Sequence, residues 1–387
     1  MSQSNFGNLE SPLNGTNFFN TYLEPWRDAL HTMHSGSSRP LYAVAGTMWL
    51  DTTTTPWVVK VFDGTDDISI GTINATTNLF AAANAVSLAG TETLTNKTLT
   101  DLTLTGTISG SAAPKINNFR LTLTTGVPVT TSDVTAASTI FLTPYNGNQI
   151  ALFTAGQWVL LSSAQVSIAL SGLTSSRPYD LFAWNNAGVV TLETLVWTND
   201  TTRATALAYQ DGVLVRSGDA TRRYLGTFYA TGATTTADSA ANRYLWNYYN
   251  RVVRLGERLE TTTSWTYSTA AWRQANGSSA NQINFVVGVA EDSFIATLMG
   301  DVANSTGTPR LVGVGIGLDT VSIPSGNSNQ AHITPSTTLP SSVRTIFASS
   351  VTAGRHYLAW LEYGAGVDTQ TWRGNPVNAG LSMNLMM

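Results

Sequence analysis

Hydrophobic and polar residues alternate strictly along one short segment of this 387-residue chain. From Asp101 onward, Leu102, Leu104 and Ile108 fall on one side of an extended chain, and threonines fall on the other. The pattern predicts a β-strand with one apolar face. Three aliphatic side chains are too few to hold a strand alone, and the flanking sequence is rich in small polar residues. We therefore expect the strand to pair with the same segment in other copies of the chain.

Short apolar runs separated by turn residues dominate the rest of the sequence and predict a mainly β protein. Before the alternating segment, the runs 42–51, 57–62 and 68–71 predict a three-stranded β-meander. After it, Gly, Pro, Asn and Ser separate further runs, which is typical of a β-sandwich. The strands predicted there are Phe119–Leu123, Ile150–Phe153, Trp158–Leu161, Tyr179–Trp184, Thr263–Tyr267, Ile283–Val289, Ser293–Leu298, Leu311–Leu318 and Arg355–Glu362.

Two segments show helical spacing instead. Within 15–35, apolar residues recur every three or four positions, and Pro25 predicts a helix that begins there and ends near Met33. In the second segment, Asp238 is a good N-cap, and apolar residues follow at four- and three-residue steps as far as Gly256. We expect this helix to pack on a sheet of its own subunit, and lining a trimer axis is the alternative. Its apolar positions are Ala241, Leu245, Tyr248, Val252 and Leu255.

These elements predict a mainly β chain with a helical and meander anchor, a short trimeric β shaft, and two β-sandwich-like domains with one packed helix. The expected parts are a helical docking segment at 1–36, the meander at 37–80, the shaft at 81–115, a first sandwich at 116–236, and the helix with a distal sandwich at 237–387.

Composition narrows the function. Only 11% of the residues are charged, the net charge is −4, and the lysines are Lys60, Lys97 and Lys115. A nucleic-acid-binding protein would need a basic surface, so nucleic acid is excluded as an expected partner. The chain has no cysteine, which excludes disulfides, thiolate nucleophiles and cysteine metal sites. No signal peptide or apolar run of membrane-spanning length is evident, so we expect no membrane insertion.

The run from Leu94 to Thr100, with the Leu-Thr-Gly repeats after it, resembles the shaft linkers of bacteriophage tail fibres and related virion spikes. Such proteins are typically trimers. A threonine-rich linker between domains is the alternative interpretation. The residues expected to line the trimer shaft are Leu94, Leu99, Leu102, Leu104 and Ile108.

A second phrase, 45–52 with 57–72, resembles a module near the N-termini of phage tail-fibre proteins. The resemblance implies that this end attaches to the virion, and we expect Trp26, Trp49 and Trp57 to take part in anchoring. Further phrases that resemble virion fibre proteins are 142–148, 197–204, 210–215 and 221–228.

The sequence contains no convincing catalytic or metal site. His31 and His34 are spaced for one helix face, but no third ligand is evident, and His332 and His356 stand apart. The alternating glycines of 313–317 lack the order of a phosphate loop, and they predict a strand whose bare face another backbone or chain approaches. Glycosidases need two carboxylates in a cleft, and spacing selects no pair. The candidate acids are Glu257, Glu260, Glu291, Asp292, Asp301, Asp319 and Glu362.

Tryptophan offers a binding chemistry, because its face can stack on sugar rings. The distal tryptophans Trp265, Trp272, Trp360 and Trp372 are the candidates for receptor contact, with one or two of them exposed. We expect no enzyme, no cofactor and no metal. The expected protein is a homotrimeric phage tail fibre or short spike of the virion, bound through its N-terminal part to a tail or capsid protein and through its distal domains to a host surface glycan or protein. The alternatives are a head fibre or decoration protein on the capsid and a tailspike-type polysaccharide depolymerase.

Overall fold

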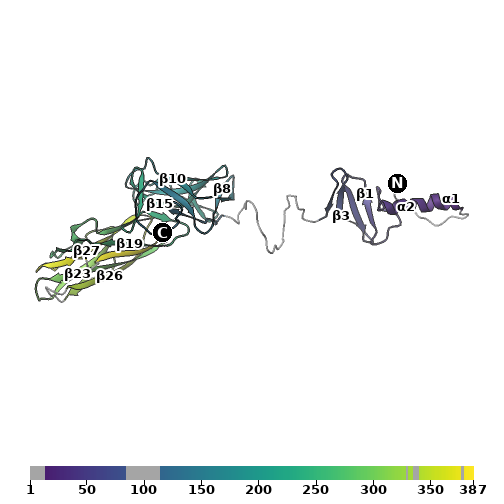
Figure 1. Ribbon diagram of the computed structural model, residues 1–387. Helices are drawn as coiled ribbons and strands as arrows, with labels where there is room; N and C mark the ends of the chain where they lie inside the picture. The colour runs from purple at the N-terminus through teal and green to yellow at the C-terminus, as the bar shows by residue number, and fades with distance from the viewer. Residues whose placement is uncertain (1–13, 84–113, 328–329, 334–339, 376–378) are drawn as a thin grey trace. The chain divides into compact units, whose positions relative to one another are not determined.

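A computed structural model describes residues 14–83, 114–327, 330–333, 340–375 and 379–387 of the chain (Figure 1). The chain is mainly β, as predicted, and forms two compact units, residues 1–102 and 103–387. Most of the expected shaft segment lies outside the described residues. The same holds for all five side chains expected to line it, Leu94, Leu99, Leu102, Leu104 and Ile108.

The described part of the first unit begins with a helical segment that is longer than predicted. It comprises α1 (Gly15–Phe18), a π-helical turn η1 (Phe19–Leu23) and α2 (Glu24–His31). The Asn14 side chain caps α1 by accepting the backbone N–H of Asn17 at 2.8 Å. Pro25 stands in the first turn of α2, where its missing N–H is not needed. The helix predicted from Pro25 to about Met33 is therefore present as α2. The helical structure of the residues before it, α1 and η1, was not predicted.

The predicted β-meander is present in the first unit. Its strands are β1 (Met48–Asp51), β2 (Trp57–Phe62), β3 (Asp67–Asn74) and β4 (Leu79–Ala82), and they pair antiparallel in chain order. The fourth strand was not predicted. It follows a turn in which the Asn74 carboxamide oxygen accepts the N–H groups of Thr76 and Thr77.

The second unit opens with strands that form three sheets, two of them small. The small sheets have the orders β10-β7-β5 and β8-β9, and the remaining strands join a large sheet. The strands are β5 (Phe119–Thr122), β6 (Val134–Ala137), β7 (Thr139–Pro144), β8 (Gln149–Thr154), β9 (Gln157–Ser162), β10 (Val166–Ala169), β11 (Arg177–Asn186), β12 (Val189–Val196), β13 (Leu207–Gln210), β14 (Val213–Arg216) and β15 (Asp219–Gly232).

The rest of the second unit completes the large sheet and adds a six-stranded one. The large sheet runs β12-β11-β15-β16-β17-β22-β27-β24-β25, and the six-stranded sheet runs β19-β29-β23-β28-β20 with β26 also paired to β23. The elements are β16 (Thr235–Asp238), β17 (Asn242–Arg243), β18 (Leu245–Asn247), β19 (Val253–Leu259), β20 (Ser264–Thr266), β21 (Trp272–Gln274), the 3-10 turn η2 (Ala275–Gly277), β22 (Gln282–Val287), β23 (Ser293–Asn304), β24 (Arg310–Leu318), β25 (Gln330–Ile333), β26 (Ser341–Ser350), β27 (Gly354–Tyr363), β28 (Gln370–Arg373) and β29 (Gly380–Met386). All nine strands predicted after the shaft are present, and the expected division at 236/237 falls inside β16.

The helix predicted from Asp238 to Gly256 is absent, and strands β16 to β19 occupy that sequence. The buried Asn247 side chain shows why. It accepts the backbone N–H of Leu121 at 2.7 Å and donates to the Leu121 carbonyl at 3.2 Å, as a neighbouring strand would. Partners more than a hundred residues away thus override a local helical pattern. The prediction of one packed helix was wrong, and no helix in the described ranges is long and apolar enough to cross a bilayer.

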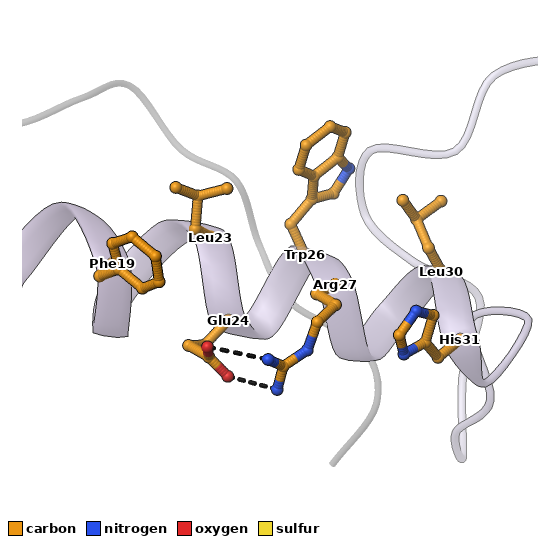
Figure 2. A pocket seen from close by; sticks show the side chains of 7 residues that line it. All are labelled: Phe19, Leu23, Glu24, Trp26, Arg27, Leu30 and His31. Atoms are coloured by element: carbon orange, nitrogen blue, oxygen red, sulfur yellow. Dashed lines mark hydrogen bonds and ion pairs between the residues drawn. The ribbon is translucent and has the colours of Figure 1, made fainter.

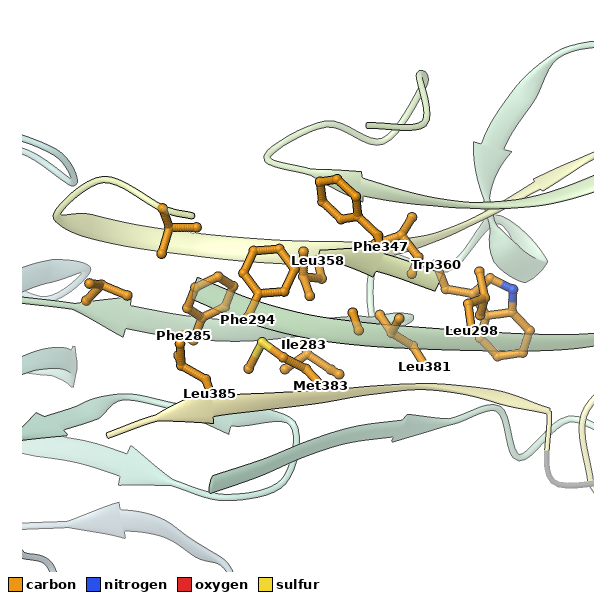
Figure 3. Close-up of a cluster of buried hydrophobic side chains, with 14 of the residues drawn as sticks. Ile283, Phe285, Phe294, Leu298, Phe347, Leu358, Trp360, Leu381, Met383 and Leu385 are labelled. Carbon is orange, nitrogen blue, oxygen red and sulfur yellow. The ribbon is translucent and has the colours of Figure 1, made fainter. Parts of the chain in front are cut away.

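The main core of the second unit lies between the six-stranded sheet and the large sheet (Figure 3). Phe294 and Leu298 of β23 and Met383 of β29 face Phe285 of β22 and Leu358 of β27, and all five are fully buried. Because alternate residues of a strand point to opposite faces, the positions between these inward residues, such as Ile295 on β23 and Asn384 on β29, face outward.

A buried arginine holds the segment around Pro114, where the described part of the second unit begins. The Arg223 guanidinium, on β15, donates to the carbonyls of Pro114, Ile116 and Ala151 at 2.7–3.0 Å. It is fully buried, and burial lowers its pKa. Its charge lies 4.6 Å from the centre of the Tyr249 ring.

Candidate functional site

An apolar stripe runs along the N-terminal helical segment (Figure 2). Phe19, Leu23, Trp26 and Leu30 recur at steps of four, three and four residues and line one side of it. Phe19 is 56% exposed, Trp26 48% and Leu30 54%. Polar residues flank the stripe, with an ion pair between Glu24 and Arg27 and with His31 beside Leu30. In the described part of the chain, the stripe is an amphipathic surface that no other element covers.

The other two tryptophans expected at the anchor are less exposed than Trp26, since Trp49 is buried and Trp57 is half-buried. Trp49 is 2% exposed, and its indole N–H donates to an Asp67 carboxylate oxygen at 3.0 Å. The Lys60 ammonium lies 4.9 Å from the centre of its ring. Trp49 therefore belongs to the meander core and cannot touch another protein with its ring, which corrects the expectation. Trp57 is half-buried, and Trp26 is the most exposed of the three.

Three of the four tryptophans expected to bind a receptor lie in the core. Trp360 and Trp372 are fully buried and Trp265 is 9% exposed, so none of them can stack on a sugar. Trp265 on β20 and Trp372 on β28 alternate with less buried residues, and periodicity alone does not reveal which face is covered. Trp360 on β27 has buried neighbours on both sides. Trp272 is half-buried, and its ring centre lies 5.2 Å from that of Tyr363. Among these four, only Trp272 keeps part of its ring in solvent.

One buried carboxylate stands out among the candidate acids. Glu362, on β27, is fully buried and accepts hydrogen bonds from the Trp265 indole at 2.7 Å, the Arg273 guanidinium at 2.8 Å and the Asn276 backbone at 3.2 Å. Burial raises the pKa of Glu362 to about 7, and these donors offset only part of that shift. Sequence spacing could not single out Glu362, because its partners come from β20, β21 and η2.

The structure brings a second acid near Glu362. The Asn276 side chain donates to Glu260 at 3.4 Å, while its backbone N–H donates to Glu362. Glu260 also accepts from Asn281 at 2.6 Å and is 6% exposed. Both carboxylates are shielded from a polymeric substrate, so this pair does not form the open cleft that glycoside hydrolysis needs.

The other candidate acids have separate environments. Glu291 and Asp292 both contact Arg251, at 3.2 and 2.5 Å. Asp319 contacts His356 at 2.7 Å. Asp301 is nearly buried, and burial raises its pKa. Glu257 lies on the outer face of the six-stranded sheet.

The histidines form no metal site within the described ranges. α2 ends at His31, and His34 lies beyond it with a positive φ, its ring nitrogen 2.8 Å from the Tyr42 hydroxyl. The two therefore do not share a helix face. His332 falls on β25, and His356 is buried against Asp319.

The alternating glycines of β24 are covered by their own chain. A Cβ on Gly315 would lie 2.8 Å from the Pro324 ring and 3.1 Å from Trp272, and one on Gly317 would lie 2.2 Å from the Thr320 carbonyl. A close backbone approach was correctly predicted. The approaching backbone is that of Thr320, and the side chains of Pro324 and Trp272 cover Gly315, so the predicted use as a subunit contact is not supported.

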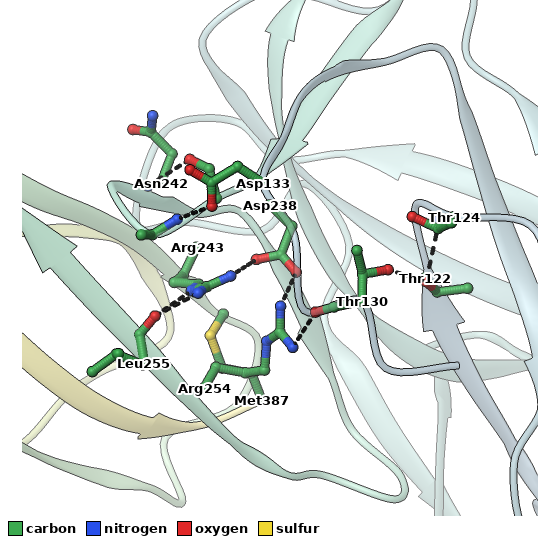
Figure 4. A network of polar contacts seen from close by, with 12 residues as sticks. Thr122, Thr124, Thr130, Asp133, Asp238, Asn242, Arg243, Arg254, Leu255 and Met387 are labelled. Atoms are coloured by element: carbon green, nitrogen blue, oxygen red, sulfur yellow. Dashed lines mark hydrogen bonds and ion pairs between the residues drawn. The ribbon is translucent and has the colours of Figure 1, made fainter. Parts of the chain in front are cut away.

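A polar network joins β16, β17 and β19 (Figure 4). Asp238 accepts from Arg243 at 2.9 Å and from Arg254 at 3.0 Å, and Arg254 also donates to the Thr130 carbonyl. Arg243 donates in addition to the Leu255 carbonyl at 2.8 Å. All three charged side chains are about nine-tenths buried. The network stabilises the fold and presents no open site.

The outer face of the six-stranded sheet is unexpectedly apolar. Ile295 on β23 is 57% exposed and Ile346 on β26 is 61% exposed. Leu255 and Val253, on β19, are 49% and 61% exposed. Sequence reasoning missed this surface, although a signal exists, because the outward positions of these strands carry aliphatic residues as well as the inward ones.

Comparisons with known proteins identify no relative. No protein-family model matches the sequence, and no curated protein matches it. The Eiger TNF of S. frugiperda is 10% identical, with a TM-score of 0.23 over 35% of this chain and 91% of that one. The sugar-binding C-terminal domain of EclA is 10% identical, with a TM-score of 0.20 over 33% of this chain and 81% of that one. A structure of the infectious bursal disease virus Gt strain is 11% identical, with a TM-score of 0.21 over 75% of this chain and 78% of that chain. Likenesses this weak carry no inference.

Proposed function

We propose that the chain is a structural protein of a bacteriophage particle, a homotrimeric tail fibre or short spike. Its N-terminal unit attaches to the particle, and its larger unit binds the surface of the host cell. The observation that carries the proposal is the uncovered apolar stripe of Phe19, Leu23, Trp26 and Leu30 on the N-terminal helical segment. The class of protein is proposed because several sequence segments resemble phage fibre proteins.

An apolar helix face in water favours a partner. Burying a Trp or Leu side chain removes enough apolar area from water to contribute roughly 1.5–3 kcal/mol. Contiguous exposed apolar surface commonly marks a protein contact. The flanking charges of Glu24 and Arg27 would set the orientation, since a polar rim around an apolar centre is the usual anatomy of an interface. A groove on a protein of the particle is the partner of matching chemistry.

The larger unit supplies the host contact in this proposal. Its surface carries few charges, which suits contact with a neutral glycan. Trp272 offers a partly exposed ring beside Tyr363, 5.2 Å away, and an aromatic face can stack on a sugar ring. Three copies of one weak site would bind a repetitive surface with high avidity.

The test uses phage particles from which the gene has been deleted. Purified full-length chain should restore adsorption to the host, and Trp26→Ala should reduce the restoration at least tenfold. Tyr209→Ala changes an aromatic residue that is 65% exposed in the other unit and serves as the matched control, with adsorption unchanged. Particles that are complete and infectious without the chain would contradict the proposal.

Two further readouts separate the alternatives. Electron microscopy of particles with gold-labelled chain should place the label on the tail, and a label on the capsid would indicate a head fibre. Host polysaccharide incubated with the chain should keep its length, and shortened products would indicate a depolymerase.

A further inference from the structure

Four strands of the six-stranded sheet present a continuous outward face. The register places Leu255 of β19, Asn384 of β29, Ile295 of β23 and Ala348 of β26 in one row across the sheet. Val253 and Met386 lie in the next row on one side. Ile346 lies in the next row on the other side, and Leu259 one row further. These aliphatic and methionine side chains are 38–61% exposed. An antiparallel sheet with one solvated face usually carries polar residues there.

Two charged residues stand at opposite edges of this face. Glu257 is on the edge strand β19 and Arg344 is on the edge strand β26, with β29 and β23 between them. A hollow of about 170 Å³ separates them, floored by the small residues Gly380 and Ser382 with Thr297. Within the described part of the chain, neither side chain has an ion-pair partner, whereas nearby Arg254 and Arg251 do. Three strand spacings put their backbones about 14 Å apart.

We infer that this face is the interface between copies of this chain, arranged in a ring of three. Opposite charges at opposite edges fit a cyclic arrangement, because β19 of one copy then meets β26 of the next. Glu257 contacts Arg344 of the neighbouring copy three times around the ring, and the unpaired charges find partners. The inference rests on the proposed trimeric function and deepens it by naming the surface that the copies share.

The dimensions of the face agree with three copies. Four strands at about 4.8 Å each make a sheet about 19 Å wide. Three such sheets set as a triangular prism around an axis along the strands leave the axis about 5.5 Å from each sheet, close to half the ~10 Å spacing of packed sheets. Side chains such as Ile295 and Thr297, at the centre of the face, would therefore fill the axis.

The cysteine-free sequence makes the contact directly testable. Full-length chain carrying both Glu257→Cys and Ile346→Cys is oxidised and run on a denaturing, non-reducing gel. The register places these two positions in one row of the face, on the edge strands β19 and β26. We expect disulfide-linked trimers, which a reducing agent converts back to monomers. A disulfide within one chain is excluded, because it needs Cα atoms less than about 7 Å apart and these lie on strands three spacings apart.

Matched controls define the contact. Each single variant alone should stay monomeric on the gel, and a mixture of the two, refolded together, should give covalent dimers. A chain with Val189→Cys in place of Ile346→Cys should not cross-link, since Val189 is as exposed (63% against 61% for Ile346) but lies on β12 in the large sheet. Covalent dimers alone from the double variant, or no cross-link at all, would overturn the ring of three.

Charge reversal gives an independent readout by solution mass. Glu257→Arg and Arg344→Glu should each weaken association at least tenfold, and the double reversal should restore it. Loss that the double reversal does not restore would overturn the pairing. If the chain restores adsorption to phage particles and the cysteines do not cross-link, the interface is wrong and the proposed function stands. If covalent trimers form and adsorption is not restored, the function fails and the interface stands.

Discussion

At the scale of residues, single buried polar groups depend on partners that the sequence does not reveal. Glu362 sits fully buried among three donors from separate strands and turns. The sequence shows a glutamate in an apolar run and nothing of the donors, so its environment could not be predicted. The tryptophans Trp265 and Trp372 make the same point, because an alternating pattern identifies a face without saying whether it is covered.

Glu362 should make stability depend on pH. Its pKa is raised to about 7 in the folded chain, mainly by burial, and is near 4.3 when unfolded. The native state therefore binds more protons than the unfolded state between these values, and stability falls as the pH rises from about 4.5 to 7. The loss should be on the order of 3 kcal/mol, measured by urea unfolding across this range.

Glu362→Gln should remove this pH slope whatever it does to the absolute stability, because the variant has no proton to exchange there. Glu193→Gln alters a side chain that is 30% exposed and should keep the slope. A slope unchanged in Glu362→Gln would mean that another group causes it.

Gly288 should tolerate no side chain. An added Cβ would lie 2.0 Å from the Tyr224 hydroxyl and 2.5 Å from the Trp246 ring. Gly288→Ala should destabilise the second unit by about 1–3 kcal/mol, measured by thermal unfolding. Gly307→Ala is the matched control, because nothing lies within 4 Å of its added Cβ, and it should change stability by less than about 0.5 kcal/mol.

At the scale of elements, the strands could be predicted from the sequence, but the helix predicted from Asp238 to Gly256 does not exist. Runs such as Trp158–Leu161 and Tyr179–Trp184 are bounded by turn residues, and each forms a strand. The apolar spacing from Asp238 to Gly256 imitates a helix because the short strands β17 and β18, the start of β19 and the turns between them place apolar residues at three- and four-residue steps by chance. The side chains that decide the outcome are polar, with Asn247 bound to Leu121 and Arg254 bound to Thr130.

Asp238 should be the residue on which these strands depend. It holds two buried arginines, Arg243 and Arg254, and Asp238→Asn leaves both without a counter-charge. Removing one partner of a buried ion pair costs about 3–5 kcal/mol, so the midpoint of denaturant unfolding should fall markedly. Glu291→Gln should cost less than about 1 kcal/mol, because its side chain is 36% exposed and Arg251 keeps Asp292. Equal effects of the two substitutions would contradict this account.

At the scale of the whole molecule, the sequence predicted the β-meander and the β-rich character of the larger unit. It did not predict that one sheet runs from β12 to β25, through the expected boundary at 236/237. Sheet membership depends on pairings such as β17 with β22 and β15 with β18, which local patterns do not encode. For the same reason, the sequence did not show that the apolar faces of the helical segment and of the six-stranded sheet are exposed.

The two units should unfold independently. Residues 103–387 form a compact unit with their own cores. A fragment of these residues should unfold cooperatively in calorimetry, with a midpoint within a few degrees of the corresponding transition in the full chain. The fragment retains Pro114 and Ile116, to which Arg223 donates. A fragment that does not fold would show that the unit needs residues 1–102.

The Arg223 guanidinium has a mechanical consequence. Tension on Pro114 from the chain before it is carried by Arg223 of β15, which also holds Ala151 of β8. A pull is therefore shared between two sheets before the first strand, β5, can peel away. The buried guanidinium therefore protects the pairing of β5 from a force applied to the preceding chain.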